Sequence, residues 1–258
     1  MINTLELDTP IHNEDAWHAW HLDRIREAAA PAGPTALTAT HWLHATEPKL
    51  AEEIPHLPGR WYQAGGGIVG IHLPAQFSTT GTVQILPGEF LDAGELTLTL
   101  VERLGDHALR IFDRTASTRS HFRSIAAFPP NSRWQIPARF EARHETVNVT
   151  DSDGVIVAVP TAGILRFTVD GRTHRLRVRV RDNALWATFS DASVNQGVHR
   201  FRFIAIARPD AAGETIIDFN RAHLPPLAFS DHFLCGAPSQ NNVLDFAVEA
   251  GEKWPVFD

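Results

Sequence analysis

Cysteine is almost absent from this chain of 258 residues, because Cys235 is its only one. A single thiol cannot form an intrachain disulfide, which excludes the disulfide-stapled class of secreted domain. Long apolar runs are also lacking: no stretch approaches about 18 apolar residues, so no membrane-spanning helix is predicted. The first ten residues contain Glu6 and Asp8 without a basic start and apolar run, so we expect no signal peptide and a cytoplasmic protein.

Positive charge is not in excess either. The formal net charge is -7 with neutral histidine, so neither nucleic acid nor an anionic membrane is an expected partner. The run from Gly65 to Gly67 lacks the spaced glycines and following helix of a phosphate-binding loop, and predicts a turn or bulge instead. Since no nucleotide-binding fingerprint appears, we expect no organic cofactor.

Rigid aromatic residues are abundant, with seven Trp and 15 Phe against one Tyr and one Met. Hydrophobic residues make up 43% of the chain and charged residues 21%, as in a globular protein with an ordinary core. The chain is long enough for one large β domain or two small ones.

The region 14–29 predicts an α-helix. Asn13 can cap its N-terminus, and Glu14 and Asp15 lie where the helix dipole favours negative charge. One face carries four residues at helical spacing: Trp17, Trp20, Arg24 and Ala28. We expect this face to pack against a β core, with the binding of a partner protein as the alternative.

Beyond a proline-containing connector at 49–59, the chain predicts short strands. The segment 95–101 alternates Leu with Thr, which is typical of a half-buried strand. Asp170-Gly171 lies between two apolar runs and predicts a β-hairpin, because both residues tolerate positive φ. The predicted strands are 68–73, 95–101, 108–112, 137–149, 164–169, 175–180, 184–189, 198–206 and 214–219.

Strands at this spacing, with little helix between them, favour a mainly β fold. We predict an antiparallel β-sandwich or barrel built from two closely packed β halves, with an N-terminal α-helix. Pro129 and Pro130 mark the expected internal boundary. The predicted division is a helix and connector at 1–58, a first β half at 59–130, and a second β half at 131–258.

The C-terminal segment from Asp218 to Lys253 is the most distinctive part of the chain. Residues 218–226 read Asp-Phe-Asn-Arg-Ala-His-Leu-Pro-Pro, and residues 250–253 read Ala-Gly-Glu-Lys. This pattern resembles the signature of the uncharacterised bacterial family catalogued as domain of unknown function 1684. His41-Trp42-Leu43 is similar to an early His-Trp-Leu of that family, and the hairpin at 170–171 is similar to its central hairpin. The resemblance covers most of the chain and implies no established activity.

Two departures from the family pattern bear on chemistry. The family usually has Tyr where this chain has His223, and Cys where it has Leu227. His223 supplies a group that titrates near neutrality. Leu227 removes a cysteine that could have formed a disulfide or a metal pair with Cys235.

Three polar signature residues could meet where the last predicted strand ends. Asp218 could orient the imidazole of His223 as a general base, and Asn220 could donate to a developing oxyanion. The structural alternative is a latch in which Asp218 and Asn220 bond to loop backbone that prolines leave unpaired.

Cys235 is a second candidate for catalysis. It could act as a nucleophile with His232 or His223 as base, or could share a zinc ion with these histidines. No paired ligand motif is present, so no metal site is predicted, and an inert buried cysteine is the alternative.

Arginines at 175, 177, 179 and 181 line one face of a predicted strand. They could bind an anionic ligand, but we expect a solvated face neutralised by Glu141 and Glu145 on a neighbouring strand. Arg119 and His121 lie between the predicted halves, where a ligand cleft would fit.

Two functions are compatible with these residues. The first is an enzyme that acts on a small molecule by cofactor-independent acid–base chemistry, by hydrolysis, elimination or isomerisation. Its catalytic residues would be His41, Asp218, Asn220, His223 and Cys235, and its binding residues would be Trp42, Arg119, His121 and His232. The second is a non-catalytic β-scaffold protein that binds a small apolar ligand or a protein partner. Exposed strand edges would permit a homodimer in either case.

Overall fold

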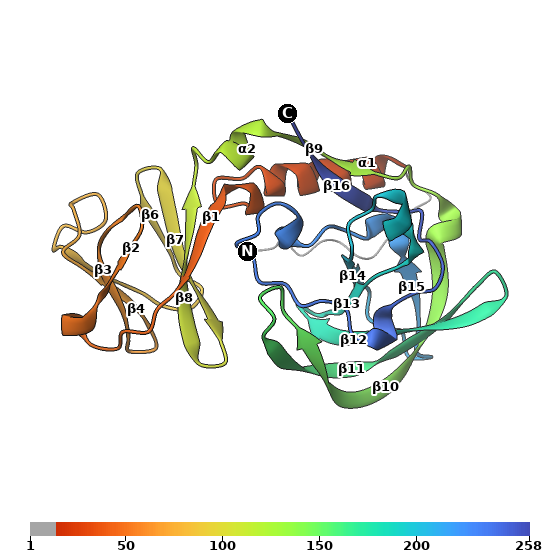
Figure 1. Cartoon of the computed structure of the whole chain (residues 1–258). Helices are drawn as coiled ribbons and strands as arrows, with labels where there is room; N and C mark the ends of the chain where they lie inside the picture. The colour runs from red at the N-terminus through yellow and green to blue at the C-terminus, as the bar shows by residue number, and fades with distance from the viewer. Residues whose placement is uncertain (1–13) are drawn as a thin grey trace. The chain divides into compact units, whose positions relative to one another are not determined.

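The computed structural model describes residues 14–258 and is mainly β (Figure 1). The predicted helix cap, Asn13, lies outside these residues. The chain forms two compact units. Unit 1 contains the described residues up to Ile25 together with Arg123–Asp258, and unit 2 contains Arg26–Phe122. The predicted division had placed its boundaries at 58 and 130.

The predicted N-terminal helix is present as α1 (Glu14–Ala28). Its indole-bearing face is buried, with Trp17 and Trp20 packed together against Ala127 of β9 (Phe122–Ala127). Nε1 of Trp17 donates to the backbone carbonyl of Asn220 (2.9 Å). The docking face predicted from the helical spacing is therefore confirmed.

Unit 2 contains two four-stranded antiparallel sheets, ordered β1-β8-β7-β6 and β2-β3-β4-β5. One buried cluster draws its side chains from both sheets, including Trp61, Ile68, Leu98 and Leu109, which is the arrangement of a β-sandwich. The strands of unit 2 are β1 (Leu37–Trp42), β2 (Glu52–Ile54), β3 (Leu57–Ala64), β4 (Gly67–Ile71), β5 (Thr82–Ile85), β6 (Phe90–Ala93), β7 (Leu96–Arg103) and β8 (Asp106–Asp113). A short helix, α2 (Ser117–His121), follows them.

Two local predictions in unit 2 were wrong. The expected connector at 49–59 contains the β2–β3 hairpin, in which Pro55 and His56 (φ 64°) make the turn. The threonines of β7 are not on a solvated face, since Thr97 and Thr99 are both buried. The Thr97 hydroxyl donates to Asp92 Oδ1 (2.5 Å), and the Thr99 hydroxyl donates to the Glu89 carbonyl (2.7 Å). These hydrogen bonds offset the desolvation cost of burying the two hydroxyls.

Unit 1 is built on a six-stranded antiparallel sheet in the order β14-β13-β12-β11-β10-β15. The Asp170-Gly171 turn has positive φ at both residues (48° and 77°), so the predicted hairpin is confirmed. The strands are β10 (Gln135–Thr150), β11 (Ile156–Val169), β12 (Arg172–Arg181), β13 (Ala184–Phe189), β14 (Arg202–Ile206) and β15 (Glu214–Asp218). A separate pair joins β9 to β16 (Glu252–Phe257).

The core of unit 1 lies between one face of the six-stranded sheet and the C-terminal signature segment. Phe219, Leu244, Val248 and Ala250 from that segment are buried in one cluster with the alternate residues of β10 to β15. Figure 1 shows the sheet curving around the segment, drawn in blue. The other residues of each strand therefore form an outer face. No helix described between residues 14 and 258 combines the length and apolar character needed to span a bilayer.

Candidate functional site

Asp218 and Asn220 form a hydrogen-bonded clasp with the loop at Asn131. Oδ1 of Asp218 accepts from the backbone N–H of Asn220 (3.1 Å) and from its Nδ2 (2.9 Å). Asn220 is 1% exposed, and its amide accepts from the Asn131 N–H (2.9 Å) and donates to the Asn131 carbonyl (3.0 Å). Both amide hydrogens are thus in use, so this Asn220 clasp has no donor left for an oxyanion.

His223 lies apart from the clasp, next to β14. Its backbone exchanges hydrogen bonds with Phe203 (2.8 and 2.9 Å). Its ring meets Trp186 and Phe203 edge to face, with centroid separations of 5.3 and 6.1 Å. Nδ1 lies 3.3 Å from the Arg221 carbonyl and must carry the hydrogen there, which leaves Nε2 as an acceptor.

Burial lowers the pKa of His223 to about 3, and the positive charges of Arg24 and Arg181 act in the same direction. The imidazole is therefore neutral at pH 7, and a base of this pKa is weak. Within residues 14–258, His223 makes no hydrogen bond to Asp218 or Asn220. The structure brings Asp218 and Asn220 together but gives His223 aromatic neighbours.

Among the half-buried side chains on the outer face of β12 to β14 are Arg179, Arg181, Trp186 and Phe203; together with His223, which bridges to Phe203, we call them the Trp186 face. Strand alternation places the strand residues among them opposite the core. Trp186 is central, with Phe203 at a centroid distance of 5.6 Å and the Arg181 guanidinium 4.8 Å over its ring. Arg179 is the direct cross-strand neighbour of Trp186.

Two polar groups on the Trp186 face lack a partner within residues 14–258. Nε1 of Trp186 is buried and has no acceptor. Arg179 has no ion pair, while burial and the charge of Arg181 lower its pKa. Buried polar groups are nearly always satisfied in folded proteins, so this face has hydrogen-bonding capacity that residues 14–258 do not use.

Of the arginines in this row, Arg177 has a predicted carboxylate partner. Nη1 of Arg177 lies 2.5 Å from Oε2 of Glu145. Glu141 pairs instead with Arg166 of β11. The prediction is therefore confirmed for Arg177 and Glu145, whereas Glu141 has a different partner and Arg179 has no ion pair within residues 14–258.

A buried ion pair anchors the sheet to the signature segment. Arg202 is 0% exposed, and its Nη2 lies 2.8 Å from Oδ2 of Asp191. The same guanidinium donates to the carbonyls of Val248 and Ala250. Oδ1 of Asp191 accepts from the Val248 N–H (3.0 Å). These additional hydrogen bonds offset the desolvation cost of burying both charges, which the attraction within an isolated ion pair often fails to offset.

A second buried carboxylate, Glu252, fastens α1 to the end of the signature. Its Oε1 accepts from Nε of Arg24 (3.0 Å) and its Oε2 accepts from the Leu224 N–H (2.7 Å). Gly251, just before it, has a φ of 75° and lies against the Ala222 carbonyl, where a Cβ would clash. The Ala-Gly-Glu sequence therefore has a structural explanation.

Cys235 is buried, and the loop that holds it packs on the β10–β11 hairpin. The Ala237 N–H donates to the Thr150 carbonyl (2.9 Å), and Oγ of Ser152 donates to the Phe233 carbonyl (3.1 Å). His232 is exposed on the same loop. Within residues 14–258, no group of three or more His, Cys, Asp or Glu side chains could hold a metal ion.

His41 belongs to unit 2, whereas the signature residues belong to unit 1. Its Nε2 lies 3.5 Å from Oε2 of Glu52. Oε1 of Glu52 accepts from the backbone N–H groups of His44 and Ala45 (2.6 Å each). Burial raises the pKa of Glu52, but these bonds outweigh it and keep the carboxylate charged. The pair thus stabilises a loop.

The other predicted binding residues also lie in unit 2. Arg119 donates from Nε and Nη1 to two backbone carbonyls (2.9 Å each) and so connects loops. His121 is exposed and its Nδ1 lies 2.7 Å from a carbonyl of its own helix. Trp42 packs under the guanidinium of Arg103, 4.6 Å from the ring centroid.

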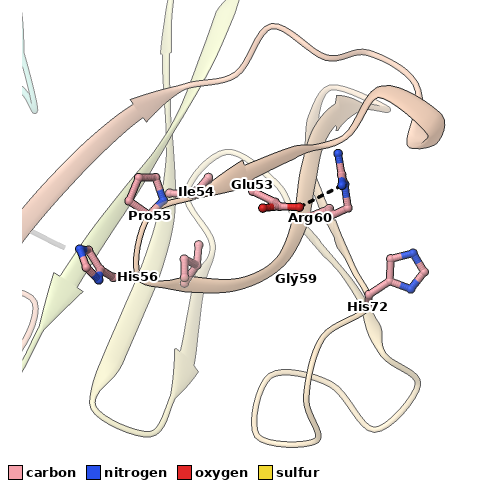
Figure 2. A pocket seen from close by; sticks show the side chains of 8 residues that line it. Glu53, Ile54, Pro55, His56, Gly59, Arg60 and His72 are labelled. Atoms are coloured by element: carbon pink, nitrogen blue, oxygen red, sulfur yellow. Dashed lines mark hydrogen bonds and ion pairs between the residues drawn. The ribbon is translucent and has the colours of Figure 1, made fainter.

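Unit 2 also has an open surface pocket of about 660 Å³ at the β2–β3 hairpin. Figure 2 shows the Glu53–Arg60 ion pair (3.0 Å) in its middle, with His56 and His72 on opposite sides. Arg60 also donates to the Ala51 carbonyl (2.8 Å). Because its arginine is already paired with Glu53 and its histidines are exposed, this pocket is a weaker candidate than the Trp186 face.

No sequence pattern predicted a functional role for Trp186, Phe203 or the Arg202–Asp191 pair. Arg202 had a signal, since it interrupts the apolar alternation of β14, where a charge must find a buried partner. Trp186 had none, because a tryptophan on a strand is equally compatible with a core or an outer face.

The family model described as "Protein of unknown function (DUF1684)" matches residues 120–253. Among solved structures, the solution NMR structure of an uncharacterized protein from Haloarcula marismortui is similar. It is 27% identical, with 51% of this chain and 77% of that chain covered and a TM-score of 0.43. No curated protein matches the chain.

Proposed function

The chain belongs to the DUF1684 family, and we propose that it is a non-catalytic β-scaffold protein that binds a small molecule at the Trp186 face. The observation that carries this proposal is the buried indole N–H of Trp186, which has no acceptor within residues 14–258. An unsatisfied buried donor costs about 1–3 kcal/mol. Protein atoms cover this N–H, so a ligand oxygen reaches it only when the side chains around it move, and the hydrogen bond would then remove that cost.

The rings around the indole suit a flat apolar ligand. Trp186, Phe203 and His223 lie with centroids 5.3 to 6.1 Å apart, and each is half-buried. Aromatic rings at such separations offer both stacking and edge contacts. Small-molecule sites typically combine an apolar lining with a few polar groups that fix orientation.

An acid–base enzyme, the function first expected from the sequence, has less support. The amide of Asn220 is committed to Asn131 and Asp218. With a pKa of about 3, His223 is a poor match for general-base catalysis near neutrality. Its free Nε2 is better suited to accepting a hydrogen bond from a ligand.

Nuclear magnetic resonance tests the proposal directly, with naphthalene-2-carboxylate as the probe. The indole N–H resonance of Trp186, identified by its loss in Trp186→Phe, should shift during titration. Trp186→Phe should weaken binding about tenfold, the expected loss for one desolvated hydrogen bond. Trp254→Phe, at an exposed site of the same unit, is the matched control and should bind normally. Shifts confined to residues away from the Trp186 face would refute the proposal.

A cytoplasmic location and a homodimer remain proposals as well. The lone thiol of Cys235 suits a reducing compartment. Light scattering at several protein concentrations would distinguish a dimer from a monomer.

A further inference from the structure

We propose that the ligand of the Trp186 face is an aromatic carboxylate, bound by the guanidinium of Arg179 and the indole N–H of Trp186. This inference rests on the proposed function and adds the chemical class of the ligand. It follows from how charge is distributed along β12.

The arginines of β12 differ in whether a carboxylate balances them. Arg177 is paired with Glu145 at 2.5 Å, and its side chain is 10% exposed. Arg181 contacts Asp182 at 3.2 Å and lies over the Trp186 ring. Arg179, between them, is half-buried and has no ion pair within residues 14–258. Arg175, which is exposed, has no ion pair within residues 14–258 either, so Arg179 differs from the rest of the row in being half-buried without one.

The position of Arg179 is suited to a bound anion. Burial and the like charge of Arg181 lower its pKa, and no carboxylate within residues 14–258 pairs with it. A half-buried cation of this kind is stabilised by an anion that binds next to it. The chain carries a net charge of -7, so unpaired positive charge here is not the result of a basic surface.

Arg179 and Trp186 are adjacent on the sheet. Arg179 faces Trp186 directly across the strand pair, and directly opposed side chains lie about 5 Å apart at Cβ. A planar guanidinium binds two carboxylate oxygens at once, while the indole N–H can donate to one of them. The aromatic body of the ligand would then lie along Phe203 and His223, whose rings surround Trp186.

Isothermal titration calorimetry with a matched pair of probes tests whether the ligand is an aromatic carboxylate. Naphthalene-2-carboxylate should bind about tenfold or more tightly than naphthalene-2-carboxamide, since a charge-assisted bond is stronger than a neutral one. Arg179→Gln should abolish this preference, and Arg179→Lys should retain part of it. Arg175→Gln, at an exposed position of the same row, should keep the full preference.

The outcomes separate the two proposals. Equal binding of acid and amide would overturn the carboxylate assignment and leave the binding function intact. Binding of neither probe would overturn both proposals. A naphthyl phosphate that binds tenfold more tightly than the carboxylate would assign the face to phosphorylated ligands and refute this inference. The comparison of acid with amide uses the unaltered protein, so it holds even if a variant fails to fold.

Discussion

Replacing His223 by Phe is expected to make unit 1 less sensitive to acid. The pKa of His223 is about 3 in the folded protein and about 6.5 in an unperturbed histidine. Between these pH values the unfolded state binds a proton that the native state does not. His223 therefore lowers the free energy of unfolding as the pH falls below about 6.5, and its full contribution to stability is present only above that pH.

The magnitude follows from the linkage relation. One such group changes the free energy of unfolding by about 1.4 kcal/mol per pH unit, which amounts to about 2 kcal/mol between pH 7 and pH 5. Any native pKa below about 4 gives nearly the same loss over this range. Phe cannot titrate, but it preserves edge-to-face contacts with Trp186 and Phe203. The bond from His223 to the Arg221 carbonyl is long, at 3.3 Å, so its loss is a small and pH-independent cost.

Urea unfolding followed by circular dichroism at pH 7, 6 and 5 measures the effect. The stability of the wild type should fall by about 2 kcal/mol more than that of His223→Phe between pH 7 and pH 5. His21 and His199, whose pKa values burial also lowers, titrate in both proteins and cancel in the difference. His232→Gln, at an exposed position, should follow the wild type. Parallel curves for the wild type and His223→Phe would refute the reasoning.

Two further substitutions test the anchors of the signature segment. Asp191→Asn should cost roughly 3–5 kcal/mol of unfolding free energy, because it leaves Arg202 as an uncompensated buried charge. Asp182→Asn, at an exposed carboxylate, is the control and should change the free energy of unfolding by less than about 1 kcal/mol. An equally small loss for Asp191→Asn would contradict the role of the Arg202–Asp191 pair as an anchor. Asn220→Ala should cost about 2 kcal/mol or more in urea unfolding by removing the bonds to Asn131. If Asn220→Ala is as stable as the exposed-site variant Asn148→Ala, the Asn220 clasp does not stabilise the fold.

Local sequence patterns predicted those elements that depend on local physics. Asp170-Gly171 marks a turn because positive φ at both positions is a property of those two residues. The helix at 14–28 follows from apolar spacing, which is again local. The β2–β3 hairpin replaces the predicted connector because Pro55, which favours a connector, is equally compatible with the start of a tight turn. Alternation of Leu and Thr along β7 shows which side chains are polar, but it does not show which are buried. Thr97 and Thr99 are buried because other parts of the protein cover that face of the strand.

The candidate site was less predictable. The sequence placed Asp218, Asn220 and His223 within six residues, and proximity in the chain suggested one polar cluster. The strand end directs Asp218 and Asn220 to the loop at Asn131, while the bridge to Phe203 places His223 on the outer face. The contacts of Asp218 and Asn220 agree with the structural alternative, in which both side chains bond to loop backbone.

What the sequence determined by itself was a mainly β protein of this family, with an N-terminal helix whose tryptophan face is buried. These properties follow from composition, periodicity and a specific motif. The tertiary structure alone decided that, within residues 14–258, Arg177 has a carboxylate partner and Arg179 has none, because partners from β10 and β13 are set by strand order and register. It also decided that the Trp186 N–H is buried and has no acceptor among the described residues. Burial and pairing are relations between distant residues, and a single strand does not encode them.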